Sequence, residues 1–173
     1  ITILPRSGFI GGYTKIAPDD DVISSGLISK KLLLSKIEIA LAGRAAEIVV
    51  FGINEITQYA ENNINYSTMI AKEMVTKYGF SIIGPVCLDQ NNEEIFLGNS
   101  LLRNKSLIAN ETSTIIDNQI IKISKDALEN AILKIRNNRS MLEKIVEVLI
   151  DEETIDGNRF KELSTNLLKV WLD

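Results

Sequence analysis

The sequence predicts a mainly α-helical domain with a small β-hairpin or sheet near its N-terminus and an antiparallel helical bundle at its C-terminus. Apolar residues recur at three- and four-residue steps along most of the chain after residue 28, which is the spacing of amphipathic helices. Two short β-prone runs, residues 1–5 and 12–16, flank a turn-rich stretch. The 173 residues are 45% hydrophobic and 24% charged, which is typical of one globular domain.

We predict a single domain over residues 1–173, built from three consecutive segments. Residues 1–28 form a β-hairpin and a surface loop, residues 29–104 a central helical lobe, and residues 105–173 the C-terminal helices. The two β-prone runs of the first segment are joined by a glycine-rich turn, which favours an antiparallel hairpin.

The central lobe is predicted to contain two helices. The first begins after Ser29, whose hydroxyl suits an N-cap, and ends at Gly52. A polar linker, residues 54–63, leads into the second helix, which ends at Gly79. The residues expected to be buried are Leu33, Ile37, Ala40, Leu41, Ala45 and Ile48 on the first helix, and Tyr66, Met69, Ile70, Met74, Val75 and Tyr78 on the second.

Beyond the second helix the sequence is irregular, and short strands are expected at residues 86–88 and 95–97. The final third is strongly helical: a long helix reaches a break at residues 137–138, another follows, and Thr154 or Asp156 caps the last. The short turns between these helices favour antiparallel packing. Their apolar stripes are Ile116, Ile120, Ile123, Ala127, Ala131 and Ile135, then Leu142, Ile145, Val146 and Leu149, then Phe160, Leu163, Leu167 and Leu168.

Composition excludes several classes of function. The chain contains no histidine, so it holds neither a Ser-His-Asp triad nor a histidine-ligated metal within itself. The net charge is −4 and the basic residues are scattered, so we expect no nucleic-acid partner. No apolar run approaches the roughly 20 residues that cross a bilayer, and we expect this chain itself to be soluble. Because it starts at Ile1 rather than Met, we expect it to continue a longer polypeptide.

Two features have competing interpretations. Cys87 is either a reactive thiol or a buried small hydrophobe, and its apolar neighbours favour burial. Arg44 and Glu47 either take part in chemistry or form an inter-helix or inter-subunit ion pair, which we favour. No set of side chains in the sequence forms a self-contained active site.

Several ordered motifs resemble one protein family. The chain is similar, over nearly its whole length, to the peptidase domain of the FtsH family of membrane-anchored, ATP-dependent zinc metalloproteases, and most similar to cyanobacterial and plastid members. The motifs are Ile-Thr-Ile-Leu-Pro-Arg at 1–6, Ala-Gly-Arg-Ala-Ala-Glu at 42–47, Val-Phe-Gly at 50–52, Ala-Lys-Glu-Met-Val-Thr at 71–76, Phe-Leu-Gly at 96–98 and Glu-Thr-Ile-Asp-Gly at 153–157.

The resemblance implies a helical FtsH-type peptidase domain working with an upstream AAA+ module, through which ATP acts, in a homo- or hetero-hexamer of FtsH-like subunits. Its substrates would be unfolded membrane proteins. Location in a cyanobacterial or plastid thylakoid membrane would follow from an upstream anchor. Zinc would be held by an H-E-x-x-H helix that precedes the segment matching residues 1–5 and supplies the catalytic glutamate. This chain has no such helix, which is either cut off or never present.

The third zinc ligand of the family is an aspartate at the start of the second helix, preceded four residues earlier by a glycine. In this chain Asn63 stands at the aspartate position and Tyr59 at the glycine position. A neutral amide binds zinc more weakly than a carboxylate, and a tyrosine resists the positive φ that glycine allows. We favour a helix N-cap as the role of Asn63 over a weak zinc ligand.

The resemblance also implies that the edge strand formed by Gly12, Tyr13, Thr14, Lys15 and Ile16 accepts unfolded substrate by main-chain pairing; a purely structural edge is the alternative. Two functions follow. Either the chain belongs to a proteolytically inactive FtsH-like subunit that acts as a hexamer-forming scaffold, or it is a fragment of an active zinc metalloendopeptidase whose H-E-x-x-H helix lies upstream of Ile1. The substitution at Asn63 favours the first.

Overall fold

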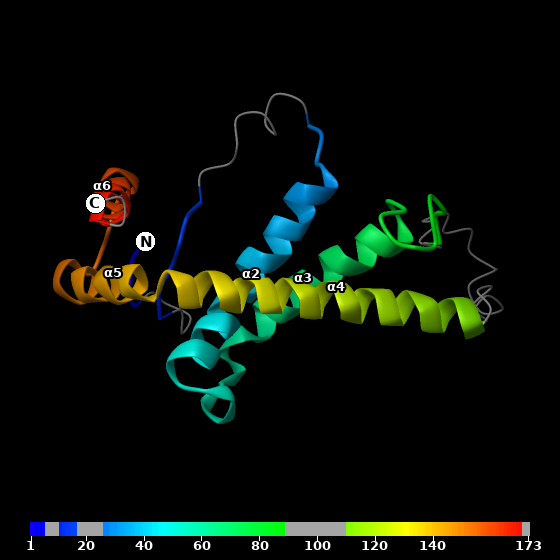
Figure 1. Ribbon diagram of the computed structural model, residues 1–173, viewed down its shortest axis with the longest axis horizontal. Coiled ribbons are helices and arrows are strands. Elements are labelled where there is room, and N and C mark those ends of the chain that lie inside the picture. Colours follow the sequence, from blue (N-terminus) through cyan, green and yellow to red (C-terminus); the bar gives the residue numbers. More distant parts are fainter. Residues whose placement is uncertain (6–10, 17–25, 89–109, 171–173) are drawn as a thin grey trace, which may run out of the picture. The chain divides into compact units, whose positions relative to one another are not determined.

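The computed structural model describes residues 1–5, 11–16, 26–88 and 110–170, without the side chains of residues 166–170. The prediction of a mainly helical chain is confirmed (Figure 1). Among the described residues there are isolated β-bridges and no strand. The elements are α2 (Lys30–Val50), η1 (Ile53–Glu55), η2 (Gln58–Ala60), α3 (Glu61–Thr76), α4 (Asn110–Asn137), α5 (Arg139–Glu152) and α6 (Gly157–Val170), where η marks a 3₁₀ turn.

The contacts within the chain group it into two compact units. One unit combines Ile1–Leu27 with Lys134–Asp173, and the other is Ile28–Leu133. This grouping does not follow the order of the three predicted segments. Most of α4 joins the central helices, because its side chains cover their core, and the N-terminal residues join the C-terminal helices through backbone hydrogen bonds.

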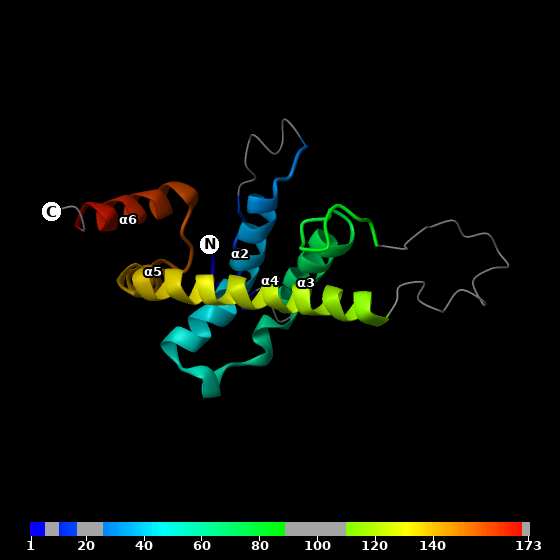
Figure 2. The same cartoon turned by 45° about the vertical axis from the view of Figure 1, so that its right-hand side comes forward.

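The core of the Ile28–Leu133 unit lies between α2, α3 and α4, and Figure 2 shows α2 and α3 with the connection between them. The predicted stripe of α2 is confirmed at four positions, and Ala127 of α4 is buried in the same cluster. Ile120, Ile123 and Leu128 of α4 pack against the cluster. Its buried members are Leu33, Ile37 and Leu41 of α2, Ile70, Ala71 and Met74 of α3, and Ala127 of α4; Ala45 is also buried.

The predicted boundaries of α2 are confirmed. The side chain of Ser29 accepts a hydrogen bond from the backbone N–H of Leu32 at 3.2 Å, as an N-cap does. At the other end the helix stops at Val50, and Gly52 has a φ of 95°, which a residue with a Cβ rarely adopts.

The predicted buried face of α3 is confirmed at Ile70, Met74 and Val75 but is wrong at other positions. Tyr66 and Met69 were expected inside but are 46% and 50% exposed, while Ser67 and Ala71 are fully buried. These two small side chains allow α2 and α3 to approach closely, which two bulky side chains would prevent. The hydroxyl of Ser67 donates to the carbonyl oxygen of Ile64 at 2.8 Å, so its burial leaves no polar atom without a partner.

The end of α3 depends on Gly79. Its φ is 64°, and the N–H of Phe80 bonds the carbonyl oxygen of Met74 at 2.8 Å, six residues back, one residue further than in a Schellman motif. The chain then folds back so closely that a Cβ on Gly79 would lie 2.6 Å from the Cα atom of Pro85. The strand predicted at 86–88 is wrong, because Leu88 N–H returns to a helix carbonyl, that of Thr76 at 2.7 Å, rather than to a strand. Residues 95–97 lie outside the described part.

The other unit joins the first residues of the chain to the turn between α5 and α6. Thr2 forms antiparallel bridges with both Tyr13 and Thr154. The N–H of Ile3 donates to Glu153 O at 3.0 Å, and the N–H of Ile155 donates to the carbonyl oxygen of Ile1 at 2.8 Å. Tyr13 lies opposite Thr2 as the predicted hairpin requires, but the expected turn falls outside the described residues, so the hairpin stays a prediction.

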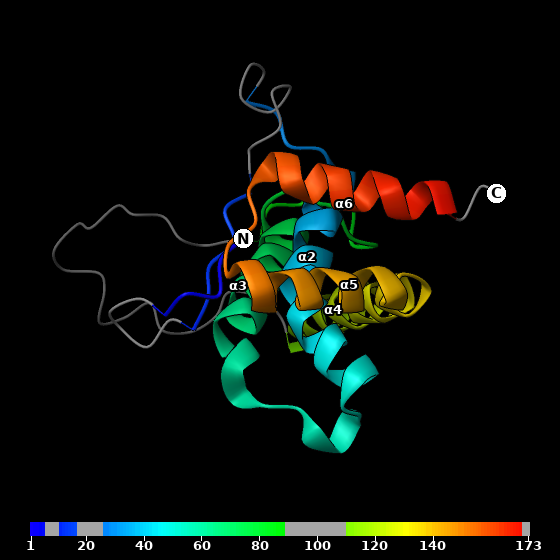
Figure 3. The same ribbon diagram turned by 90° about the vertical axis from the view of Figure 1, so that its left-hand side faces the viewer.

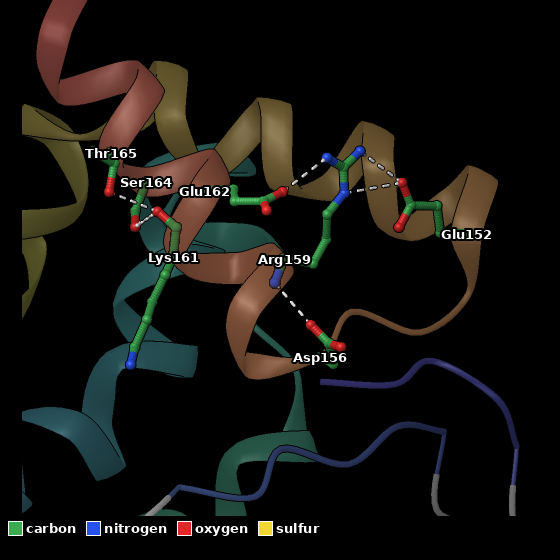
Figure 4. Close-up of polar contacts among 7 residues, drawn as sticks. All are labelled: Glu152, Asp156, Arg159, Lys161, Glu162, Ser164 and Thr165. Atoms are coloured by element: carbon green, nitrogen blue, oxygen red, sulfur yellow. Dashed lines mark hydrogen bonds and ion pairs between the residues drawn. The ribbon is translucent and has the colours of Figure 1, made fainter.

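The turn between α5 and α6, whose backbone Figure 3 shows, is further fixed by side chains of its own (Figure 4). Glu153 ends α5 in the left-handed conformation, with φ of 55°. Asp156 caps α6 by accepting from the N–H of Arg159 at 2.7 Å, which confirms the second of the two predicted caps. The guanidinium of Arg159 lies 2.9 Å from Glu152 and 3.6 Å from Glu162.

Among the described helices, none has the length and apolarity of a membrane span.

Candidate functional site

Asn63 lies in the first turn of α3, where its side chain is exposed. The helix begins at Glu61 and its N-cap residue is Ala60, so the favoured role of Asn63 as an N-cap is wrong. The reason is local: η2 runs directly into α3, and a backbone turn replaces the capping side chain. The polar linker predicted before α3 therefore contains two 3₁₀ turns, and the helix starts earlier than expected.

Tyr59 lies in η2 and is 72% exposed. Within the described residues, Glu153 is the one non-glycine residue with a positive φ, so the backbone at Tyr59 avoids the left-handed region. The connection has thus taken a conformation that accepts a tyrosine. It does not use the conformational freedom that a glycine would bring to this position.

Glu47, at the end of α2, contacts the connection directly. The hydroxyl of Thr57 donates to its Oε1 at 2.5 Å, and the N–H of Thr57 donates to its Oε2 at 3.4 Å. Arg44 Nη1 lies 3.4 Å from Glu47 Oε2, within the same helix, so the expected inter-helix ion pair is wrong for these two residues. The hydrogen bonds from Thr57, helped by the charge of Arg44, lower the pKa of Glu47 below its ordinary value of 4.5 against the opposing effect of desolvation.

The residues present do not fit a zinc site. Zinc in proteins takes imidazole, thiolate or carboxylate donors, and this chain has no histidine. The exposed thiol of Cys87, expected to be buried, lies beyond α3, and the carboxylate of Glu47 is engaged by Thr57 and Arg44. In the part of the chain that the structure describes, no group of three histidine, cysteine, aspartate or glutamate residues could hold a metal ion. Asn63 is therefore a neutral amide without partner ligands from these residues.

The predicted substrate strand lies beside Thr2. Tyr13 exchanges both backbone hydrogen bonds with Thr2, at 2.8 and 2.9 Å. In an antiparallel pair the backbone groups of the flanking residues, here Gly12 and Thr14, point to the other side. Gly12 lies so close to Thr2 that a Cβ there would be 3.1 Å from the Thr2 carbonyl oxygen. Lys15 and Ile16 are exposed. The capture of substrate at this edge stays a prediction.

The sequence did not single out Thr57. A threonine just before a turn is typical of a side chain that caps the turn, and Thr57 does accept from the N–H of Tyr59 at 3.3 Å. Its contact with Glu47 spans ten residues across a connection of irregular shape, and no periodic pattern predicts such a pair.

Comparison with known proteins shows the family of the chain. Residues 1–163 match the sequence profile of Peptidase family M41. The chain belongs to this family. It is 37% identical over 163 residues to the ATP-dependent zinc metalloprotease FtsH of Cyanidium caldarium, covering 94% of this chain and 26% of the relative. It is 34% identical over 167 residues to FtsH 3 of Synechocystis sp., covering 96% of this chain and 27% of the relative.

A plant relative of this M41 chain extends the same finding. The chloroplastic ATP-dependent zinc metalloprotease FTSH 8 of Arabidopsis thaliana is 36% identical over 170 residues, covering 98% of this chain and 24% of the relative. The chain thus spans about a quarter of the length of these relatives. The resemblance to the FtsH peptidase domain is confirmed, and the relatives include cyanobacterial and chloroplast proteins.

Proposed function

We propose that this chain is the peptidase-domain portion of an FtsH-like subunit that is proteolytically inactive as it stands and serves as a scaffold in a hexamer of such subunits. The observation that supports the proposal is the exposed neutral amide of Asn63 at the third-ligand position, in a chain that contains no histidine. A zinc peptidase needs three protein donors to hold the ion and lower the pKa of its bound water. The residues of this chain supply neither the three donors nor, without a bound ion, the lowered pKa of the water.

Metal analysis tests the inactivity directly. The purified chain, incubated with zinc chloride and then desalted, is expected to retain no stoichiometric zinc and to leave a casein-like substrate intact. The double variant Tyr59→Gly, Asn63→Asp restores the family's residues at both positions and should still hold no zinc, because one carboxylate is not a tetrahedral site. One tightly held zinc per chain in the unmodified protein would overturn the proposal.

Exposed apolar side chains support assembly. At the end of α2, Val50 and the following residue Phe51 are 40% and 67% exposed. No residue of α5 is buried, and Val146 and Ile150 on it are 46% and 66% exposed. Such surfaces are typical of faces that pack against another subunit. Sedimentation at tens of micromolar should therefore show self-association, and a strictly monomeric profile would contradict it.

The remaining parts of the proposed assembly lie outside this chain. ATP would act only through an upstream AAA+ module, and a membrane anchor there would place the subunit at a cyanobacterial or thylakoid membrane. Unfolded membrane proteins would be its substrates, captured at the edge formed by Gly12–Ile16, where outward backbone groups of Gly12 and Thr14 can pair with an extended peptide. A Thr14→Pro variant should weaken the binding of an unfolded polypeptide, whereas Lys31→Gln, at an exposed residue of α2 outside this edge, should not.

A second candidate is a fragment of an active zinc metalloendopeptidase. It is favoured by the relatives, which are named zinc metalloproteases and are 34–37% identical to the chain. An H-E-x-x-H helix upstream of Ile1 would supply the two histidines and the glutamate. Casein cleavage by a longer version of the protein, abolished when that glutamate is replaced by glutamine, would establish this candidate and exclude the scaffold.

A further inference from the structure

We propose that Glu47 is a positioning residue that, through Thr57, fixes the connection between α2 and α3 and thereby the place of Tyr59 and Asn63. Glu47 and Thr57 together form the Glu47–Thr57 clasp. Its relevance to the peptidase site rests on the proposed function, in which Asn63 marks the third-ligand position. The contacts that define the clasp do not depend on that function.

The clasp links four groups in sequence. Arg44 pairs with Glu47 on α2, and these two side chains are only 14% and 18% exposed. Both oxygens of Glu47 accept from Thr57, one from the hydroxyl and one from the N–H. The hydroxyl of Thr57 in turn accepts from the N–H of Tyr59, inside the turn that leads into α3. The end of one helix is therefore joined to the start of the next by side-chain hydrogen bonds.

Apolar burial does little to hold the connection. Of residues 51–60, Ala60 alone is buried, while Ile53 and Tyr59 are 62% and 72% exposed. The backbone hydrogen bonds within it are local, such as the one from Glu55 N–H to Gly52 O at 3.2 Å. A segment with few buried contacts opens easily unless other bonds restrain it. The charge-assisted bonds of the clasp provide that restraint.

The clasp has a consequence for the start of α3. A metal ion that binds a residue in a loop commonly orders that loop, so that its removal loosens the local structure. Here the ordering comes from a carboxylate and a threonine of the chain itself. The conformation of residues 53–60, which lead to Asn63, should therefore be insensitive to chelator and to added zinc, but sensitive to the loss of Thr57 or Glu47.

Amide hydrogen exchange on the full chain tests this inference. In Thr57→Val and Glu47→Ala, we expect exchange over residues 53–60 to rise about threefold or more, while residues 33–45 in the core of α2 keep their protection. Thr57→Ser retains the hydroxyl and should keep the protection of the unmodified chain. Addition of EDTA or of zinc chloride to the unmodified chain should change nothing in residues 53–60.

Two matched controls make the test specific. Glu73→Ala breaks an exposed ion pair with Lys77 on α3, and Thr68→Val removes an exposed threonine bond to Ile64 on the same helix. Neither should alter exchange in residues 53–60. Unchanged exchange in Thr57→Val, an equal rise in either control, or loosening by EDTA alone would overturn the clasp. Because zinc content is measured separately, a chain that binds zinc would refute the proposed inactivity without changing the outcome for Thr57→Val.

Discussion

The hydroxyl of Thr154 donates to the hydroxyl of Thr2 at 2.8 Å, across 152 residues of sequence. The hydroxyl of Thr2 also donates to the carbonyl oxygen of Glu153 at 3.3 Å and accepts from the N–H of Leu4 at 3.2 Å. Thr2 is only 9% exposed, and Ile155 beside it is 1% exposed. The side chain of Thr2 therefore adds to the backbone hydrogen bonds of Ile1 and Ile3 that hold the first residues of the chain on the turn between α5 and α6.

Replacing Thr2 should destabilise the protein. Thr2→Val keeps the shape of the side chain but leaves the hydroxyl of Thr154 without its partner, at a cost of about 1–2 kcal/mol. For a protein of this size that corresponds to a fall in Tm of about 4 °C, measured by thermal unfolding followed by circular dichroism. The control Thr165→Val removes an exposed bond to Lys161 and should leave Tm unchanged. Equal Tm values for the two variants would show that Thr2 does not have this role.

Gly79 and Gly43 should respond in opposite directions to alanine. At Gly79 the φ of 64° and the contact with Pro85 oppose a Cβ, so Gly79→Ala should lower the free energy of unfolding by about 1–3 kcal/mol. Gly43 lies inside α2 with nothing within 4 Å of an added Cβ, and Gly43→Ala should raise that free energy by up to about 1 kcal/mol. Urea unfolding measures both. A neutral Gly79→Ala would mean that the turn after α3 rearranges without cost.

Two isoleucines of α2 lie on different faces of the helix, one in the core and one exposed. Ile37 is 0% exposed in the cluster with α3 and α4, so Ile37→Ala should cost about 2–5 kcal/mol through lost burial and a cavity. Ile39, two residues away, is 57% exposed, and Ile39→Ala should change stability by less than about 0.5 kcal/mol. Comparable losses from both variants in urea unfolding would place the core elsewhere.

The Glu47–Thr57 clasp should respond to acid. The pKa of Glu47 is lowered on folding, chiefly by its hydrogen bonds from Thr57, so the ionised group stabilises the folded state above its unfolded pKa of about 4.5. That contribution is lost as the pH falls through the lower pKa of the folded state. Glu47→Gln should therefore be less stable than the unmodified chain near neutral pH, and the difference should vanish in acid. A difference that is constant with pH would indicate that the charge of Glu47 is not involved.

Local features of the sequence predicted the helices well. Ser29 and Gly52 bound α2, and Gly79 follows α3, because caps and left-handed glycines act on their immediate neighbours. The stripe of α2 was predicted correctly at four of its six positions, since its large apolar residues recur on one face. The stripe of α3 was predicted correctly at Ile70, Met74 and Val75, but its buried face also uses the small residues Ser67 and Ala71, which the pattern of large apolar residues did not predict.

For the candidate site, the sequence predicted which residues stand at the family's positions but not their conformation. The motifs placed Asn63 at the third-ligand position and Tyr59 before it, and both departures from the family are visible in the sequence. That Asn63 lies inside the first turn of α3, rather than capping it, depends on how η2 joins the helix. The exposure of Cys87, wrongly expected to be buried, likewise depends on how the chain folds back after α3.

The sequence by itself determined the family, the helical content, the absence of histidine and the starts and stops of the helices at Ser29, Gly52 and Gly79. Tertiary structure alone decided the pairing of Thr2 with Thr154, the clasp between Glu47 and Thr57, and the burial of Ser67 and Ala71 on α3. The physical reason is distance along the chain. Caps and turns are set by neighbouring residues, whereas close packing and long-range hydrogen bonds select their partners only when the whole chain has folded.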